Sequence, residues 1–434
     1  MTARVSEHKP ERSASREASI HVASDTAMLQ RLRVKNFKLL RDVDVELSKK
    51  APTVLIGPNA SGKSTVIEVL DFLSRCASDG LQRAVTAHGG MAAIRTIGTR
   101  NPIEISVSLT FRTTAELGDK DWDLTWTVVF GTSPAGQVQI QSETLMDGER
   151  KLLETAQDGG RLLYNELALD EAPTTIPDSQ ALVFETHADP QRYKGLGLVE
   201  VLLTEIRVLG ALSSIPSWAA ASTERASARD AVVISTESFV GREGVGLATA
   251  LYNLQTEHAD AWATLERAFR AEFPFVKRIV FPPDPGGSRI SFAIEDERFS
   301  ARRVFASEMS DGMIVFLCLL SLVLHPNQQA VLALDEPDAH LHPSALRRLL
   351  ALAQEPHQHR HLLIVTHSNA LLDELRDPVA SIRVVEVTPQ GARIRKLDAE
   401  SLTAWRTEYS LSELRQTGLL DPSNTSYDKD GNDE

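Results

Sequence analysis

Two hydrophobic patterns recur along the chain, and each is typical of a different kind of β-strand. In the first pattern apolar and polar residues alternate, as in a strand with one solvated face. Alternating segments lie at residues 29–37, 42–47, 103–111 and 122–130. In the second pattern a short run is entirely apolar, as in a parallel strand buried on both faces. Such runs lie at residues 53–56, 330–334 and 361–365.

Segments with helical periodicity lie between and after these strands. They occur at residues 66–73, 198–209, 247–273, 314–324 and 411–416, and further strands are expected at 289–295, 382–387 and 391–397. The strand patterns loosen across residues 148–289, where no heptad pattern persists over several turns. We therefore predict an α/β protein in which a parallel core and an antiparallel β-subdomain are joined by an inserted, mostly helical arm.

This pattern predicts one core domain that is interrupted by the arm. The expected organisation is a disordered leader at 1–28, the first part of the core at 29–147, the arm at 148–289, the second part of the core at 290–420 and a disordered tail at 421–434. The length of 434 residues agrees with a large core that carries an insertion.

Composition narrows the functional classes. The formal net charge is −13, so only a local basic patch could bind nucleic acid. The two cysteines, Cys76 and Cys318, give no support for a disulfide framework or a zinc site, which indicates a reducing compartment. No secretory signal is evident, and the longest apolar run, 314–324, is about half of the ~20 residues that a membrane span needs. We expect a cytoplasmic protein that does not engage a membrane.

A glycine-rich segment joins the apolar run at 53–56 to the helix at 66–73. It consists of Gly57, Pro58, Asn59, Ala60, Ser61, Gly62, Lys63, Ser64 and Thr65. Glycines let the backbone curl so that N–H groups point inward, and the helix that follows directs its positive dipole end at the same anion. We expect Lys63 to contact the β- and γ-phosphates of ATP and the Ser64 hydroxyl to ligate Mg²⁺.

Two later strands end in residues that suit phosphate chemistry. Asp335 and Glu336 follow the run at 330–334, and His367 follows the run at 361–365. Ligands of α/β sheets bind at the carboxyl ends of the strands, so Asp335 is expected to hold Mg²⁺ and Glu336 to deprotonate the attacking water. His367 could hydrogen-bond the γ-phosphate or the water. His340 and His342 could suggest a metal site, but no third ligand is identifiable nearby.

Together with Ser310, Asp311 and Gly312, these motifs resemble those of AAA-type ATPases of the ABC-ATPase branch, the group of RecF, SMC-like and OLD-like proteins. The resemblance implies a P-loop ATPase of ABC type that dimerises head to tail. It also implies that Ser310 and Gly312 form the signature that contacts the γ-phosphate bound to the other subunit. Further implied roles are Walker B magnesium ligand for Asp335, catalytic base for Glu336 and switch histidine for His367.

Three details of the resemblance are less regular. Met313 stands where related sequences often carry a small polar residue. Gln139 and Gln141 are candidates for the family's Q-loop only by their position after the antiparallel strands. Asn36 and Phe37 resemble an Asn-Phe element that lies near the nucleotide in the family, and an ordinary edge strand explains them equally well.

The sequence favours a Mg²⁺-dependent ATPase. The resemblance implies that it forms a homodimer or larger assembly around ATP and acts on DNA or a partner effector, in DNA repair or defence against phage. The residues after His367 are too few for a further nuclease domain of ordinary size, so a nuclease would be a separate chain. The alternatives are the nucleotide-binding subunit of a membrane transporter and an ATP-gated DNA clamp without hydrolysis. Two basic clusters, Arg31/Arg33/Lys35/Lys38 and Arg298/Arg302/Arg303, could meet DNA phosphates, though solvated strand faces also explain them.

Overall fold

A computed structural model of the chain describes residues 28–397 and residues 411 and 413, with gaps. The gaps are residues 49–50, 113–119, 157–158, 167–170, 178–179, 188, 190–191, 211–227, 234–239, 242–243, 283–288, 299–301, 327–329, 340, 356–360 and 390. The expected leader, apart from Met28, and the expected tail lie outside the described residues. Of the helix expected at 411–416, only residues 411 and 413 are described, and both are helical.

The alternating segments form one antiparallel sheet, as predicted. Its strand order is β2-β1-β4-β5-β6-β7-β8-β9. The strands are β1 (Met28–Phe37), β2 (Leu40–Glu46), β4 (Ile103–Arg112), β5 (Asp121–Thr132), β6 (Val138–Asp147), β7 (Arg150–Thr155), β8 (Arg161–Leu163) and β9 (Thr174–Ile176). In β5 the buried and less buried positions alternate along the strand, so one face packs inward and the other lies toward solvent.

The apolar runs form a second sheet with the order β10-β16-β17-β3-β18-β19, in which all neighbours are parallel except β18 and β19. Its strands are β10 (Ile206–Leu209), β16 (Val331–Asp335), β17 (His361–Val365), β3 (Thr53–Ile56), β18 (Ile382–Thr388) and β19 (Gly391–Lys396). Every residue of β3 and β17 is buried, because both faces of this core sheet are covered. The predicted combination of a parallel core with an antiparallel subdomain is confirmed.

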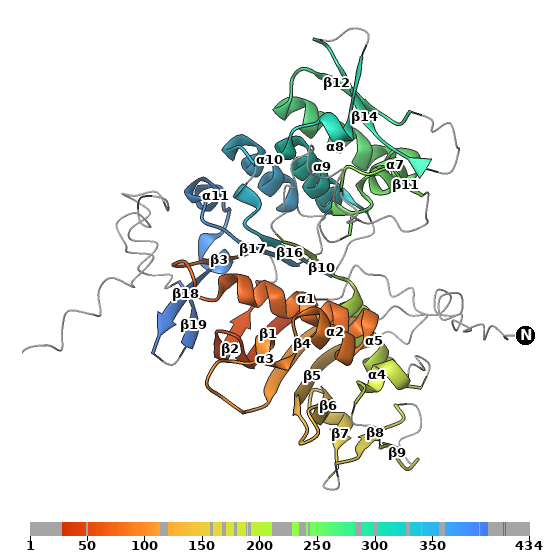
Figure 1. Cartoon of the computed structure of the whole chain (residues 1–434), viewed down its shortest axis with the longest axis vertical. Helices are drawn as coiled ribbons and strands as arrows, with labels where there is room; N and C mark the ends of the chain where they lie inside the picture. Colours follow the sequence, from red (N-terminus) through yellow and green to blue (C-terminus); the bar gives the residue numbers. More distant parts are fainter. Residues whose placement is uncertain are drawn as a thin grey trace, which may run out of the picture.

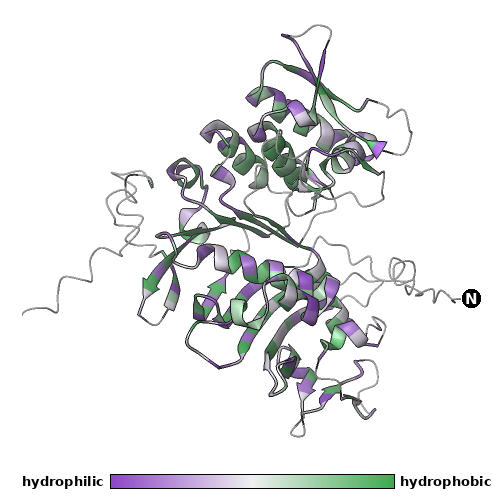
Figure 2. Ribbon diagram, in the orientation of Figure 1, coloured by the Kyte–Doolittle hydropathy of each residue, from purple (hydrophilic) through white to green (hydrophobic). Residues whose placement is uncertain are grey.

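Helices fill the layers on both faces of the core sheet (Figure 1). The helices α1 (Lys63–Asp79) and α5 (Lys194–Thr204) lie between the two sheets. The helices α7 (Leu247–Glu257), α8 (Ala259–Glu272), α9 (Asp311–Leu324) and α10 (Pro343–Ala353) cover the other face. Along β3 the side chain of Leu55 joins the first layer, whereas Val54 and Ile56 join the second. Figure 2 shows the resulting hydrophobic centre, in which the core strands and α9 are green.

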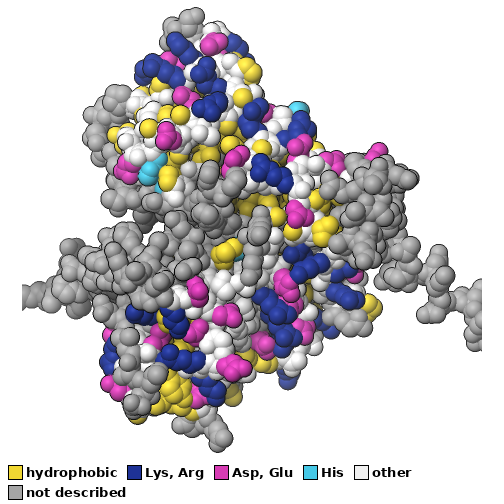
Figure 3. All heavy atoms as spheres, turned by 180° about the vertical axis from the view of Figure 1, so that it is seen from behind, with side chains coloured by type: hydrophobic (Ala, Val, Ile, Leu, Met, Phe, Trp, Pro, Cys, Tyr) yellow, Lys and Arg dark blue, Asp and Glu magenta, His cyan; other side chains and the backbone are white. Residues whose placement is uncertain are grey.

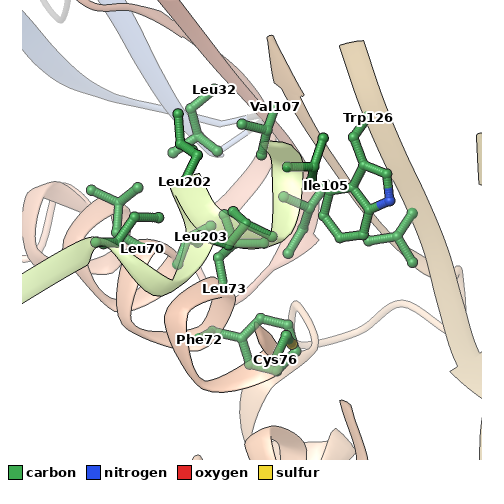
Figure 4. Close-up of a cluster of buried hydrophobic side chains, with 14 of the residues drawn as sticks. Leu32, Leu70, Phe72, Leu73, Cys76, Ile105, Val107, Trp126, Leu202 and Leu203 are labelled. Atoms are coloured by element: carbon green, nitrogen blue, oxygen red, sulfur yellow. The ribbon is translucent and has the colours of Figure 1, made fainter. Parts of the chain in front are cut away.

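The layer between the sheets is a close-packed apolar core (Figure 4). Side chains from β1, β4 and β5 meet those of α1 and α5 there. The labelled residues are Leu32, Leu70, Phe72, Leu73, Cys76, Ile105, Val107, Trp126, Leu202 and Leu203. Phe72 of α1 also lies 5.7 Å from Phe37 and 5.6 Å from Phe130, measured between ring centroids. This packing ties the helix that follows the glycine-rich loop to the antiparallel sheet.

The shorter elements connect these layers. They are α2 (Leu81–Ala87), α3 (Met91–Ile94), α4 (Val183–Thr186), η4 (Ala306–Glu308), η5 (Pro337–Ala339), α11 (Asn369–Asp373) and α12 (Pro378–Ser381). The outer end of the α7–α10 layer carries a three-stranded sheet of β12 (Val276–Val280), β14 (Ala293–Asp296) and β15 (Arg303–Phe305) (Figure 1). The strands β11 (Val232–Val233) and β13 (Arg289–Ile290) form a separate pair.

The structure distributes residues 148–289 differently from the single helical arm that we expected. Strands β7, β8 and β9 extend the antiparallel sheet, and α5 packs against α1. The helix expected at 198–209 ends at Thr204, and Ile206–Leu209 becomes β10, an edge strand of the core sheet beside β16. Only the later part, with α7, α8 and β12, belongs to the layer beyond the core sheet. Residues 206–209 form a strand because they pair with β16, and β7 forms because it pairs with β6. The local hydrophobic periodicity does not reveal such pairing between distant segments.

A buried charged pair joins β6 to β8. Arg161 donates from Nη1 to Glu143 at 2.6 Å, and the two side chains are 3% and 0% exposed. Glu143 also accepts from the indole of Trp126 at 3.2 Å and from the backbone N–H of Val183. Burial raises the pKa of the Glu143 carboxyl, and Arg161 and Trp126 oppose that shift. These bonds compensate the desolvation of a carboxylate in the core.

Candidate functional site

The glycine-rich loop runs from the end of β3 to the start of α1, where the sequence predicted it. Gly62 adopts φ 101°, and Gly57 adopts φ 153°, a value that residues with side chains rarely take. A Cβ atom on Gly57 would stand 2.2 Å from the carbonyl oxygen of Val385 in β18. Glycine is therefore required where the loop leaves the core sheet.

Lys63 lies inside this loop, although it carries a charge. Its side chain is buried, and Nζ donates to the carbonyl oxygens of Gly57 at 2.9 Å and Pro58 at 2.6 Å. The loop thus holds the ammonium group among its own backbone atoms, next to the free N–H groups of the first turn of α1. An anion that enters the loop therefore contacts the Lys63 ammonium group and the N–H groups at the start of α1.

Ser64 and Asp335 come together across 271 residues of sequence. The Ser64 hydroxyl donates to Asp335 Oδ1 at 3.1 Å. Burial raises the pKa of the Asp335 carboxyl, the neighbouring Glu336 adds to the rise, and the bond from Ser64 opposes it. A divalent cation between the two oxygens would favour the ionised carboxylate, since carboxylate and hydroxyl oxygens are typical Mg²⁺ ligands.

Glu336 and His367 lie at the ends of two adjacent strands. Glu336 adopts φ 47°, an uncommon value for glutamate, and its N–H donates to the carbonyl oxygen of Val365 at 2.9 Å. Its carboxylate lies 3.6 Å from His367 Nε2, and both side chains are partly exposed. The buried hydroxyl of Thr366 donates to Asp338 at 2.7 Å and fixes the turn that carries His367. Strained backbone of this kind is frequent at active sites.

The residues present fit a nucleotide phosphate with its magnesium ion. The loop offers Lys63 and the start of α1 to an anion, and Ser64 with Asp335 offers oxygen ligands to a cation. In addition, the Ser61 hydroxyl is 2% exposed and has no hydrogen-bond partner among the described residues. A buried polar atom without a partner is costly, and a phosphate oxygen in the loop would satisfy it.

Ser310 and Gly312 begin a different helix, on the other face of the core sheet. Ser310 is the N-cap of α9 and accepts a 3.4 Å bond from the N–H of Met313. α9 packs in the layer opposite α1. Its side chains Val315 and Leu319 line a small cavity together with Asp335 and Glu336. The start of α9 is thus linked through its second turn to the acids at the end of β16.

Arg229, which contacts the segment before α9, was not predicted as a site residue. Its guanidinium donates to the carbonyl oxygens of Ala306 and Met309 and to the carboxylate of Asp311. These contacts span about 80 residues of sequence, and Arg229 stands in no recognisable motif. Only the folded chain reveals them.

Family models match both halves of the chain. Residues 28–150 match an "AAA ATPase domain", and residues 215–373 match an "AAA domain, putative AbiEii toxin, Type IV TA system". The two matches contain the phosphate loop and the Asp335–His367 region, respectively. The fold is also that of an Smc head bound to the C-winged helix domain of ScpA, at 14% identity and a TM-score of 0.51 over 86% of this chain and 99% of that one.

The chain is thus similar to AAA ATPase domains in sequence and has the fold of an Smc head. A second Smc head, from Pyrococcus furiosus with an extended coiled coil and bound to the C-terminal domain of ScpA, is 13% identical with a TM-score of 0.50. That comparison covers 88% of this chain and 99% of the other. No curated protein sequence matches the chain. Across the described residues, no helix is both long and apolar enough to span a membrane.

The Asn-Phe element and the two candidate glutamines lie farther from the phosphate loop. Phe37 is fully buried in the core, and Asn36 donates to the carbonyl oxygen of Pro102 at 2.8 Å. The turn that follows them does approach the phosphate loop, because a Cβ atom on Gly62 would lie 3.6 Å from the Cβ of Leu39. Gln139 and Gln141 lie in β6, three strands beyond β1 in the antiparallel sheet.

The histidines near β16 do not form a cation site in the part of the chain that the structure describes. His340 lies outside the described residues. His342 is the N-cap of α10, and its Nδ1 bonds the Ser344 hydroxyl at 2.7 Å. No group of three or more His, Cys, Asp or Glu side chains that could hold a metal occurs among the described residues.

The residues of both basic clusters are paired with acids. On the antiparallel sheet the pairs are Arg31 with Asp44, Arg33 with Asp42, Lys35 with Glu104 and Lys38 with Glu68. On the outer sheet they are Arg298 with Asp296, Arg302 with Glu308 and Arg303 with Glu295. Figure 3 likewise shows basic and acidic side chains interspersed over one face of the molecule. The pairing favours solvated strand faces over a continuous basic surface for DNA.

Proposed function

We propose that the chain binds ATP with Mg²⁺ at the carboxyl edge of its core sheet and hydrolyses it. The observation that carries this proposal is the 3.1 Å contact between Ser64, at the start of α1, and Asp335, at the end of β16. It brings the phosphate loop and the acidic strand to one point. The matches to two AAA ATPase family models support the same conclusion.

Each site residue has a role in this proposal. Lys63 and the N–H groups of residues 59–65 bind the phosphates, and Ser64 with Asp335 would hold Mg²⁺, which neutralises phosphate charge when bound. Glu336 accepts the proton of the attacking water. His367, 3.6 Å from Glu336, orients the water or the γ-phosphate. Glu336 takes this role with a strained backbone, at φ 47°, as residues of active sites often do.

The signature completes the site in a second copy of the chain. Because α9 and α1 cover opposite faces of the core sheet, Ser310 and Gly312 would contact the γ-phosphate held by the other subunit of a head-to-tail dimer. The dimer carries two nucleotides, and hydrolysis separates the subunits. This proposal agrees with the exposed position of Ser310 at the start of α9.

The direct test compares ATP hydrolysis and mass in solution for the parent protein and two variants. Glu336→Gln should retain ATP binding and the ATP-dependent dimer but lose about 10²- to 10⁴-fold in turnover, because the general base is removed. Lys63→Ala should lose ATP binding itself. Unchanged turnover in Glu336→Gln would show that another group is the base. A parent protein that dimerises with ATP but never hydrolyses it would favour the ATP-gated clamp.

We further propose that hydrolysis drives a separate effector chain in defence against phage or in DNA repair. The description of the model that matches residues 215–373 names a toxin of a toxin–antitoxin system, which supports a defence setting. The paired basic clusters favour a protein effector, such as a nuclease, as the immediate partner. Turnover should therefore respond to that partner more than to double-stranded DNA alone. Stimulation of turnover by DNA alone, with a steep dependence on salt concentration, would contradict a protein effector as the immediate partner.

A further inference from the structure

Arg229 fixes the backbone that leads into α9. Its Nη1 donates to the carbonyl oxygens of Ala306 and Met309, both at 2.7 Å, and its Nη2 donates to Asp311 Oδ1. The Arg229 side chain is 8% exposed. A guanidinium group is planar and rigid, so its three bonds set the relative positions of three groups on either side of Ser310.

Asp311 occupies a position where its charge matters. It is the first residue of α9, directly after the N-cap Ser310, and its side chain is 39% exposed. A carboxylate here interacts well with the helix dipole, but it would repel a phosphate that approaches the same free N–H groups. The bond to Arg229 neutralises this carboxylate and holds it to one side of the helix start.

We propose that Arg229 is a positioning residue for the signature. It keeps Ser310 and the first turn of α9 in place and cancels the charge of Asp311, so that the helix can receive the γ-phosphate of a second copy. This inference rests on the proposed function. The cavity that Val315 and Leu319 of α9 share with Asp335 and Glu336 gives the same helix a route to the acids, so a displaced signature would also disturb turnover.

The experiment uses the full chain with Arg229→Gln, Arg229→Lys and the double variant Arg229→Gln/Asp311→Asn. Arg278→Gln is the control for loss of an arginine–carboxylate pair, because Arg278 pairs with Glu295 on the outer sheet. For each protein, ATP affinity, kcat, KM and the ATP-dependent dimer in a Glu336→Gln background are measured. Melting temperatures verify that every variant is folded.

We expect Arg229→Gln to bind ATP within about twofold of the parent, because the phosphate loop lies on the opposite face of the core sheet, and to lose about 10- to 100-fold in kcat together with the dimer. Arg229→Lys keeps the positive charge but not the planar set of hydrogen-bond donors of a guanidinium group. It should therefore retain the dimer with a reduced kcat. The double variant should recover part of the loss, because the uncompensated carboxylate is gone. Arg278→Gln should match the parent.

Three results would overturn the inference: unchanged kcat and dimer in Arg229→Gln, an equal loss in the double variant, or a parallel loss of ATP affinity. A parent protein that neither hydrolyses ATP nor dimerises would instead refute the proposed function. In that case amide hydrogen exchange of the nucleotide-free proteins decides the role of Arg229. Exchange in residues 306–313 should be faster in Arg229→Gln and unchanged in residues 57–65, and equal exchange in 306–313 would refute the positioning role.

Discussion

Replacing Gly57 with alanine tests how closely the phosphate loop is packed against the core sheet. The new Cβ would lie 2.2 Å from the carbonyl oxygen of Val385 and 3.1 Å from its carbon. Relief of this contact requires a displacement of at least about 1 Å, because nonbonded atoms separate to more than 3 Å. Val385 is fully buried in β18, between β3 and β19, so the loop rather than the strand should move.

A shift of about 1 Å in a group that positions a substrate lowers rates by about 100-fold, and overpacking costs about 1–3 kcal/mol of stability. We therefore expect Gly57→Ala to lower kcat/KM for ATP about 100-fold. It should also lower the free energy of unfolding, measured in urea, by about 1–3 kcal/mol. Gly98→Ala is the control, since Gly98 has φ 84° with no atom within 4 Å of an added Cβ. Backbone strain should lower the free energy of unfolding of Gly98→Ala by about 1–2 kcal/mol, and its turnover should equal that of the parent. Parental turnover in Gly57→Ala would refute the described packing of the loop.

Three further variants test other parts of the structure. Ser64→Ala should raise the Mg²⁺ concentration for half-maximal hydrolysis about tenfold, as for the loss of one contact to a charged group, and an unchanged Mg²⁺ dependence would argue against Ser64 as a ligand. Arg161→Met should lower the unfolding free energy by about 3–5 kcal/mol, because Glu143 is left buried without its cation; a cost below about 1 kcal/mol in a urea titration would contradict this. Burial raises the pKa of Glu166 to about 7 from its ordinary 4.5, so this group destabilises the folded chain progressively as the pH rises from about 4.5 to about 7. Glu166→Gln should therefore gain about 3 kcal/mol relative to the parent between pH 5 and pH 8, and a difference that does not vary with pH would refute the assignment.

The core sheet was predictable because its strands carry their signal locally. The runs that became β3, β16 and β17 are short, apolar and followed by motif residues, so type and position were both evident. The same holds for the meeting of Ser64 with Asp335, since parallel strands bring their carboxyl ends to one edge.

What the sequence did not reveal depends on contacts between distant segments. The segment 198–209 is largely apolar, and its few polar residues, such as Thr204 and Glu205, are compatible with a continuous helix. Pairing with β16 determines the change from α5 to β10. The Glu143–Arg161 pair and the bonds of Arg229 are likewise invisible locally, because an isolated arginine gives no sign of burial. The pairing of both basic clusters with acids follows largely from strand register, as in Arg31 opposite Glu46 and next to Asp44.

The carbonyl oxygens that hold Lys63 have a kinetic consequence for nucleotide capture. The carbonyl oxygens of Gly57 and Pro58 accept hydrogen bonds from the Lys63 ammonium group and so order the loop around it. We expect an incoming phosphate to exchange these partners for its own oxygens without reordering the loop. No slow ordering step then precedes association. The observed rate in a stopped-flow experiment should rise linearly with ATP concentration, and the release of spent nucleotide should be fast, because the departing charge is replaced from within the loop.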